Sequence, residues 1–188
     1  MSEEQLIKEI KNNPDGFEKI YNRYYQTIFN YCFRRTRNFD TSKDITSETF
    51  LKAFLNIHRF KWKGISILSW LYRIATNEIN LYYRSKKYTP KLMNESYGEK
   101  YSFNTLENLE EERLNAELQI EKHKQFIKVQ KAVKELPIKY QEVISLKYFE
   151  KLKIKEISTV LNKKEGTIKS LLSRGITQLK QKLERNLS

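Results

Sequence analysis

Several residue types that mark particular functions are scarce or absent in this sequence. The single cysteine, Cys32, excludes an internal disulfide, and His58 and His123 are the only histidines available to a metal or a catalytic step. There is no glycine-rich phosphate loop, and no apolar run approaches the roughly 20 residues that cross a bilayer. The N-terminal stretch MSEEQLIKEI is acidic, where a secretory signal is basic. We therefore expect a cytoplasmic protein without membrane insertion, and predict no catalytic residue, metal site or cofactor.

Positive charge dominates the chain but is unevenly distributed. Lys and Arg outnumber Asp and Glu by 36 to 23, which gives a formal net charge of +13 and an isoelectric point near 9.6. This excess favours a polyanionic partner, such as a nucleic acid, over an acidic small substrate. Residues 105–121, in contrast, hold six glutamates and one arginine. They adjoin residues 88–108, whose proline, glycine, asparagine and serine content is typical of a linker.

Helical periodicity occurs on both sides of this linker. Apolar residues recur at spacings of three and four over residues 17–36, 45–57 and 67–83, and Asp40 or Thr41 is a suitable cap for the second of these helices. The pattern predicts an all-α fold of two small helical bundles. The predicted parts are an N-terminal domain over residues 1–87, an acidic flexible linker over 88–116 and a C-terminal domain over 117–188.

Two short helices separated by a polar turn are predicted near the C-terminus. An apolar helical face over residues 154–161 is interrupted by Asn-Lys-Lys at 162–164 and resumes on a lysine-rich helix. This spacing is typical of a helix-turn-helix, whose second helix enters the DNA major groove, although a merely solvated basic face is the alternative. Basic side chains donate to guanine edges there, and hydroxyls donate or accept. The predicted reading residues are Glu165, Thr167, Lys169, Ser170, Ser173 and Arg174.

A second cluster combines aromatic rings, cations and amides. Rings stack on unpaired bases, cations follow the phosphates, and asparagine amides supply the polar floor that a flipped base needs. The cluster therefore favours single-stranded nucleic acid, while a core role for Trp62 and Trp70 fits the same pattern equally well. The predicted residues are Arg59, Phe60, Lys61, Trp62, Lys63, Arg73, Asn77, Asn80 and Arg84.

A third cluster lies on the second predicted helix. Asp44, Glu48 and Lys52 are spaced by four, beside Thr49 and Leu51. Such a mixture of carboxylates and apolar groups suits docking on a basic helix of another protein. An internal pair between Glu48 and Lys52, worth roughly a few tenths of a kcal/mol, accounts for the spacing as well. Spacing alone does not separate these two interpretations.

Longer motifs connect these clusters. The first part of the chain contains FEKIYNRYYQTIFNYCFR, DITSETFLKAF and SWLYRIATNEIN, and the second contains AVKELPIKYQEVISLKYFEKLKIKEISTVLNKKEGTIKSLLSRG. In these motifs the chain resembles the extracytoplasmic-function (ECF) type of sigma factor, a two-domain subunit of bacterial RNA polymerase. The resemblance covers about residues 17–87 and 131–183. Its second part is specific, because the Leu-Pro opening, the Tyr-Phe-Glu bend and the Glu-Gly-Thr-Ile-Lys-Ser helix start occur in order.

The resemblance implies a role for each cluster. The helix over residues 44–54 would bind the clamp helices of the largest polymerase subunit, and the chain would also contact the polymerase flap. Residues 60–66 and the helix through Asn77 would read and melt the downstream promoter element, with Asn80 and Leu81 near the position where the family commonly carries an aspartate. The C-terminal reading helix would bind the upstream element, around minus thirty-five, as duplex DNA. An anti-sigma factor is a further partner that the family implies.

The predicted function is that of an alternative sigma factor, monomeric when free, that directs core RNA polymerase to promoter DNA and opens it. A dimeric helix-turn-helix regulator that binds palindromic operators is the alternative. A third interpretation, a nucleic-acid-processing enzyme, requires a carboxylate or metal cluster near the basic faces. The sequence shows no such cluster.

Overall fold

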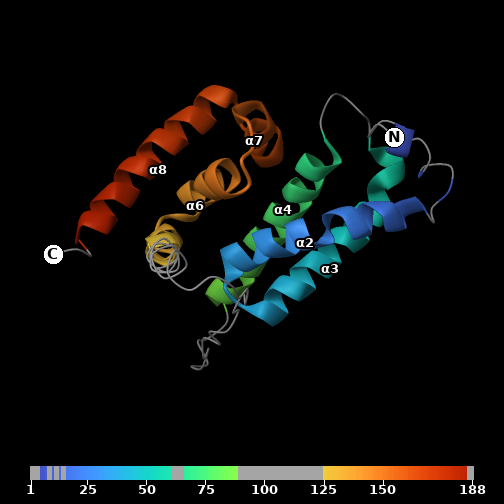
Figure 1. Cartoon of the computed structure of the whole chain (residues 1–188), viewed down its shortest axis with the longest axis horizontal. Coiled ribbons are helices and arrows are strands. Elements are labelled where there is room, and N and C mark those ends of the chain that lie inside the picture. The colour runs from blue at the N-terminus through green and yellow to red at the C-terminus, as the bar shows by residue number, and fades with distance from the viewer. Residues whose placement is uncertain are drawn as a thin grey trace, which may run out of the picture.

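The computed structural model is helical throughout the parts of the chain that it describes (Figure 1). Those parts are residues 5–7, 10, 13, 16–60, 66–88 and 125–185, with the side chains of 86–88 left aside. Within them, no helix combines the length and the apolar character needed to cross a membrane. The predicted all-α fold is confirmed, whereas nearly all of the predicted linker lies outside the described residues.

Three long helices build the N-terminal half. They are α2 (Phe17–Thr36), α3 (Phe39–Asn56) and α4 (Ile67–Tyr88), with the short 3-10 turn η2 (Ile57–Arg59) after α3. Each carries apolar residues at helical spacing, so each has one face that must be buried. The three helices pack against one another, and their shared interior is the core of this half.

A tight corner joins α2 to α3. Arg37 adopts a left-handed φ of 58°, and its N–H donates to the carbonyl of Phe33 and closes α2. Asn38 then caps α3 by accepting a hydrogen bond from the Thr41 amide at 2.8 Å. The prediction of Asp40 or Thr41 as the cap was wrong, because the asparagine before the helix already reaches that amide.

Two tyrosines lie at the centre of the N-terminal core. The rings of Tyr31 and Tyr72 pack edge to face with centroids 5.1 Å apart. The Tyr31 hydroxyl shares a hydrogen bond of 2.8 Å with the Thr76 hydroxyl, so this buried polar group is satisfied. Burial raises the pKa of Tyr31 to about 12, and the phenol therefore stays protonated at neutral pH. The fully buried apolar residues of α4 around this pair are Ile67, Leu71, Ala75 and Ile79.

The C-terminal half contains the predicted helix-turn-helix. Helical residues 125–134 precede α6 (Ile138–Ile144), and a π-helical turn, η3 (Ser145–Phe149), leads out of it. The two helices of the motif are α7 (Ile154–Leu161) and α8 (Glu165–Arg185). The predicted interruption at residues 162–164 therefore falls between them.

Close packing fixes α7 and α8 in place. Asn162 ends α7 with a left-handed φ of 52°, which asparagine tolerates well. Gly175 brings α8 close to α6, since a Cβ atom at this position would lie 3.2 Å from Ile144 Cδ1 and 3.3 Å from Tyr140 Cβ. The apolar side chains between the two helices of the motif are Ile157, Val160, Ile168 and Leu172.

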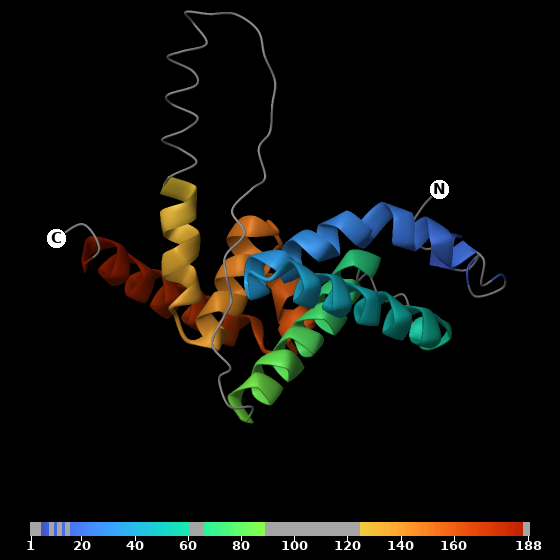
Figure 2. The ribbon, with the colours of Figure 1, turned by 90° about the horizontal axis from the view of Figure 1, so that it is seen from below.

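The two halves contact each other where α4 lies against α7, while α8 extends away from the N-terminal helices (Figures 1 and 2). Glu150 follows η3, and its side chain is only 3% exposed. Its carboxylate accepts hydrogen bonds from Arg34 Nε at 3.1 Å and from the Tyr72 hydroxyl at 2.6 Å. Asn80 on α4 donates to Glu142 Oε1 at 2.8 Å. Two buried carboxylates of the C-terminal half therefore bind the N-terminal half.

Candidate nucleic-acid interface

The predicted reading residues lie together on the outer side of α8. The opposite side of this helix is buried through Ile168, Leu172 and Gly175. On the outer side, Arg174 Nη2 donates to the Ser170 hydroxyl at 2.6 Å, one helical turn away. Ser170 is half-buried, and the exposed members of the set are Glu165, Thr167, Lys169, Ser173 and Arg174. The structure thus shows that these residues share one polar, cationic surface of α8.

A second polar stripe runs along α4. Arg73, Asn77 and Arg84 are exposed, and helical spacing places them on the same side as Asn80. Asn80 itself is half-buried because its amide nitrogen is bound to Glu142. Its Oδ1 atom is buried and has no hydrogen-bond partner in the described part of the chain. Of the two asparagines, Asn77 is therefore the one that is exposed to solvent in this arrangement.

The aromatic part of this second cluster is less accessible than the sequence predicted. Phe60 is 8% exposed, and its ring packs on Trp70 with centroids 4.8 Å apart. Phe60 is thus a core residue here and not a free ring for stacking on bases, because its contact with Trp70 removes it from solvent. Arg59 is exposed, whereas residues 61–63 lie outside the described residues.

An open groove of about 450 Å³ lies where α4 meets the helix-turn-helix. Its lining contains three cations and no carboxylate. The lining residues are Arg73 from α4 and, from α7 and the turn, Ser158, Thr159, Asn162, Lys163 and Lys164. The groove therefore brings Arg73 of the polar stripe close to the two lysines that precede α8 and gives this junction a positive potential.

The surface predicted on α3 is mixed in character. Asp44 is exposed and Leu51 is 51% exposed, as docking requires. Thr49 is fully buried, and its hydroxyl donates to the Ile45 carbonyl at 2.7 Å. Thr49 therefore does not reach a partner protein, which corrects its inclusion in the predicted docking surface. Successive side chains on an α-helix point in directions about 100° apart, so a residue that follows an exposed position can face the core. Adjacency in the sequence to Glu48 was therefore not sufficient to place Thr49 on the surface.

Lys52 has two ion-pair partners rather than one. Its Nζ lies 3.2 Å from Glu48 on the same helix and 2.7 Å from Glu78 on α4. The hydrogen bond to Glu78 is the main cause that raises the pKa of Lys52. The internal pair left open by the sequence is present, and Lys52 also ties α3 to α4. The exposed apolar patch beside it consists of Leu51, Phe54 and Leu55.

Comparison with known proteins assigns both halves to one family. The sigma-70 region 2 family matches residues 20–89, and the sigma-70 region 4 family matches residues 126–179. The chain is 32% identical over 182 residues to the ECF RNA polymerase sigma factor SigW of Bacillus subtilis (strain 168), with 94% of each chain covered. The chain belongs to the ECF-type sigma factors. The RNA polymerase sigma factor YlaC of the same strain is 31% identical, over 92% of this chain and 94% of that protein.

The sigma factor also shares its fold with a solved structure. The structure of CnrH in complex with the cytosolic domain of CnrY matches with a TM-score of 0.68 at 16% identity and covers 97% of both chains. At this identity the likeness concerns the fold. Family membership makes this sigma factor a non-enzymatic subunit that directs RNA polymerase to specific promoters for transcription initiation.

Two residues of the sigma factor that no local pattern indicated are Glu142 and Glu150. Both belong to region 4, and both bind side chains of region 2. The partner of Glu150, Arg34, is 116 positions away in the sequence. The sequence indicates only that Glu150 is a polar residue in a bend. Its burial results from the packing of the two halves, which the sequence does not show.

Proposed function

We propose that this sigma factor reads two promoter elements with two different helices while core polymerase holds both domains. In this proposal α8 binds the upstream element as duplex DNA. The polar stripe of α4 binds the non-template strand of the downstream element and keeps it unpaired. The exposed face of α8, separated from a buried face by half a turn, is the observation that supports the proposal most strongly.

The chemistry of α8 suits duplex recognition. Lys169 and Arg174 present donors that match guanine edges or phosphates, and Thr167 lies in the first turn, where backbone amides attract phosphate. Because the cations contribute through counterion release, binding to isolated promoter DNA is expected to be weak and to fall steeply with salt. Polymerase overcomes this weakness by holding the two domains at a high effective concentration on one promoter.

The chemistry of α4 suits a single strand. Arg73 and Arg84 can follow phosphates, and the Asn77 amide can donate to and accept from the edge of an unpaired base. Asn80 carries the same amide, but Glu142 occupies it when the two halves are packed together. For Asn80 to reach DNA, region 4 must move away from α4. We therefore place promoter opening after this separation, driven by binding energy and without nucleotide hydrolysis.

The exposed patch on α3 is the proposed contact with polymerase. Leu51, Phe54 and Leu55 offer apolar area, and Asp44 and Glu48 offer negative charge to a basic clamp helix. A second contact, with the polymerase flap, is proposed on region 4. That half also exposes large apolar side chains, namely Phe126, Ile127, Ile138 and Tyr148.

An anti-sigma factor is proposed as a regulatory partner that covers these same surfaces. The support is the set of exposed large apolar side chains on α3 and on region 4, since contiguous apolar patches mark interaction sites. Copurification from native cells tests this proposal. A bound protein that is displaced by core polymerase supports it, while a polymerase-free pool of sigma factor without any partner contradicts it.

Run-off transcription with core polymerase tests the main proposal. The sigma factor, working as a cytoplasmic monomer, should start transcription at discrete promoters with asymmetric elements. A chain that is folded and bound to core polymerase but initiates at none of the native promoters would contradict the melting role. A stable homodimer on a palindromic site would favour the alternative of a conventional regulator.

A further inference from the structure

The guanidinium of Arg35 is buried between the two halves of the molecule and has no hydrogen-bond partner among the described residues. Arg35 is 2% exposed, and Nε, Nη1 and Nη2 make no hydrogen bond to any described group. Its position is fixed from behind, because its backbone carbonyl accepts a hydrogen bond from the Tyr83 hydroxyl at 2.5 Å. A buried cation that lacks a partner is strongly disfavoured. The packing around Arg35 therefore calls for a negative group next to it.

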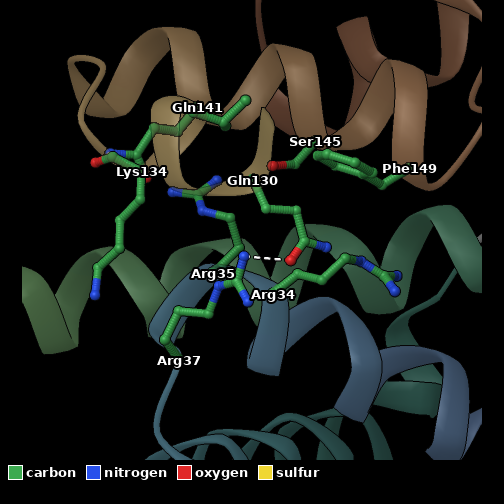
Figure 3. A pocket seen from close by; sticks show the side chains of 9 residues that line it. Arg34, Arg35, Arg37, Gln130, Lys134, Gln141, Ser145 and Phe149 are labelled. Atoms are coloured by element: carbon green, nitrogen blue, oxygen red, sulfur yellow. Dashed lines mark hydrogen bonds between the residues drawn. The ribbon is translucent and has the colours of Figure 1, made fainter. Parts of the chain in front are cut away.

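A small cavity of about 10 Å³ adjoins this guanidinium (Figure 3). Its lining includes four cationic residues and no carboxylate. These cations come from both halves, with Arg34, Arg35 and Arg37 at the end of α2 and Lys134 at the end of helical residues 125–134. Figure 3 shows the Arg35 side chain extending from α2 toward Gln141 and Gln130 of the C-terminal half. The cavity is thus a positive site at the junction of regions 2 and 4.

The polar groups around the cavity are already engaged with other partners. The Gln130 side-chain oxygen accepts a hydrogen bond from Arg37, and the Gln141 amide nitrogen donates to the carbonyls of Lys134 and Leu136. The two buried carboxylates of the same interface also have other partners, because Glu150 accepts from Arg34 and Tyr72 and Glu142 accepts from Asn80. None of these groups forms a hydrogen bond with the Arg35 guanidinium.

We propose that this cavity binds one small monovalent anion of the halide class. A volume near 10 Å³ holds about one water-sized particle, so a monatomic anion fits this space better than a phosphate or sulfate with four oxygens. The anion accepts hydrogen bonds from the Arg35 guanidinium and lies in the positive potential of Arg37 and Lys134. Because the site has walls from both halves, the anion joins region 2 to region 4.

Bromide is the direct probe of this site. Crystals of the full chain grown in sodium bromide should show an anomalous peak within hydrogen-bond distance of the Arg35 guanidinium. In solution, the nuclear magnetic resonance line of chloride should broaden when the protein is added, because bound chloride exchanges with free chloride. The proposal is overturned if the density beside Arg35 carries no anomalous signal, which would identify water. It is overturned equally if bromide binds only at lattice contacts.

Thermal unfolding measures how far chloride binding stabilises the folded protein. Potassium chloride replaces potassium glutamate at constant ionic strength, so general screening is unchanged. Above the dissociation constant, a tenfold rise in chloride should raise the ratio of folded to unfolded protein by up to tenfold. Arg35→Met should remove this dependence and also the chloride line broadening. An equal chloride dependence in wild type and Arg35→Met would overturn the proposal.

A milder pair of variants guards against misfolding of Arg35→Met. Lys134 is exposed and lines the cavity, whereas Lys131 is exposed on the same helix and does not line it. Lys134→Gln should weaken chloride binding several-fold by lowering the positive potential at the site. Lys131→Gln changes the net charge equally and should leave chloride binding unchanged. If both variants weaken binding to the same extent, the effect is one of overall charge and the assigned site is wrong.

Discussion

Replacing Glu150 by glutamine measures how firmly region 4 is held against region 2. The carboxylate is 3% exposed and accepts from Arg34 at 3.1 and 2.5 Å and from the Tyr72 hydroxyl at 2.6 Å. Breaking a buried ion pair by removing one partner costs about 3–5 kcal/mol, and one charge-assisted hydrogen bond contributes about 1.5–3 kcal/mol. Arg34 is 26% exposed and can regain water, and glutamine still accepts one hydrogen bond. We therefore expect a loss of about 2–3 kcal/mol.

Such a loss shifts the equilibrium between packed and separated domains by roughly 30- to 150-fold, at tenfold per 1.4 kcal/mol. Energy transfer between dyes on exposed positions, introduced as Ser47→Cys and Gln181→Cys, reports the separation directly. The native Cys32 stays unlabelled, because it is buried and desolvation raises the pKa of its thiol to about 12. Glu150→Gln should lower the transfer efficiency while the helical content remains that of the wild type.

Glu135→Gln is the matched control for this experiment. Glu135 pairs with Lys182 at 3.1 Å inside region 4, and its side chain is 48% exposed. An exposed pair of this kind contributes about 0–1 kcal/mol, so the control should leave the dye separation unchanged. If Glu150→Gln gives the same energy transfer as Glu135→Gln, Glu150 does not hold the two halves together and the reasoning from its burial fails.

Four further outcomes follow from single sites. Arg174→Gln should weaken duplex binding and reduce the slope of log affinity against log salt by about 1 if its partner is a phosphate, measured by a salt titration on promoter DNA. Leu55→Asp should lower affinity for core polymerase at least tenfold with an unchanged melting temperature, checked by a pull-down titration and calorimetry. Gly175→Ala should lower the free energy of unfolding by about 1–3 kcal/mol, because the added Cβ would crowd α6. Gly166→Ala, which has open space around it, should not lower it, and urea unfolding of the two variants measures the difference. Because the pKa of Tyr31 is raised to about 12 in the folded state, the protonated phenol contributes fully to stability below pH 10, and this contribution is lost as the pH rises through about 12. Tyr31→Phe should therefore show a smaller loss of stability between pH 10 and 12, measured by urea unfolding at each pH.

The helices and the turn of the DNA-reading motif were predictable because they depend on local spacing. The break at residues 162–164 separates two apolar faces, and the observed helices α7 and α8 begin and end around it. Charge and side-chain type were enough to place Lys169 and Arg174 on an exposed face. Information of this kind lies within one or two helical turns.

Burial at the borders of helices and contacts between the two halves were less predictable. Thr49 and Phe60 are polar or aromatic residues beside exposed positions, and only the packing of α3 and of Trp70 shows that they are buried. Arg35 is an arginine like Arg34 and Arg37, which are only half-buried, yet its side chain is enclosed between α2 and region 4. Such long-range contacts leave no periodic signal in the chain, so the interface between regions 2 and 4 required the structure.

Footprinting of the complete initiation complex tests the central claim most directly. Core polymerase with wild-type sigma factor should protect the upstream element from nuclease and make thymines of the downstream element reactive to permanganate. Asn77→Ala should keep the upstream protection and lose the permanganate reactivity, and Arg174→Ala should weaken the upstream protection first. If both variants lose protection and reactivity in parallel, α4 and α8 do not read separate elements, and the assignment of two promoter-reading surfaces is wrong.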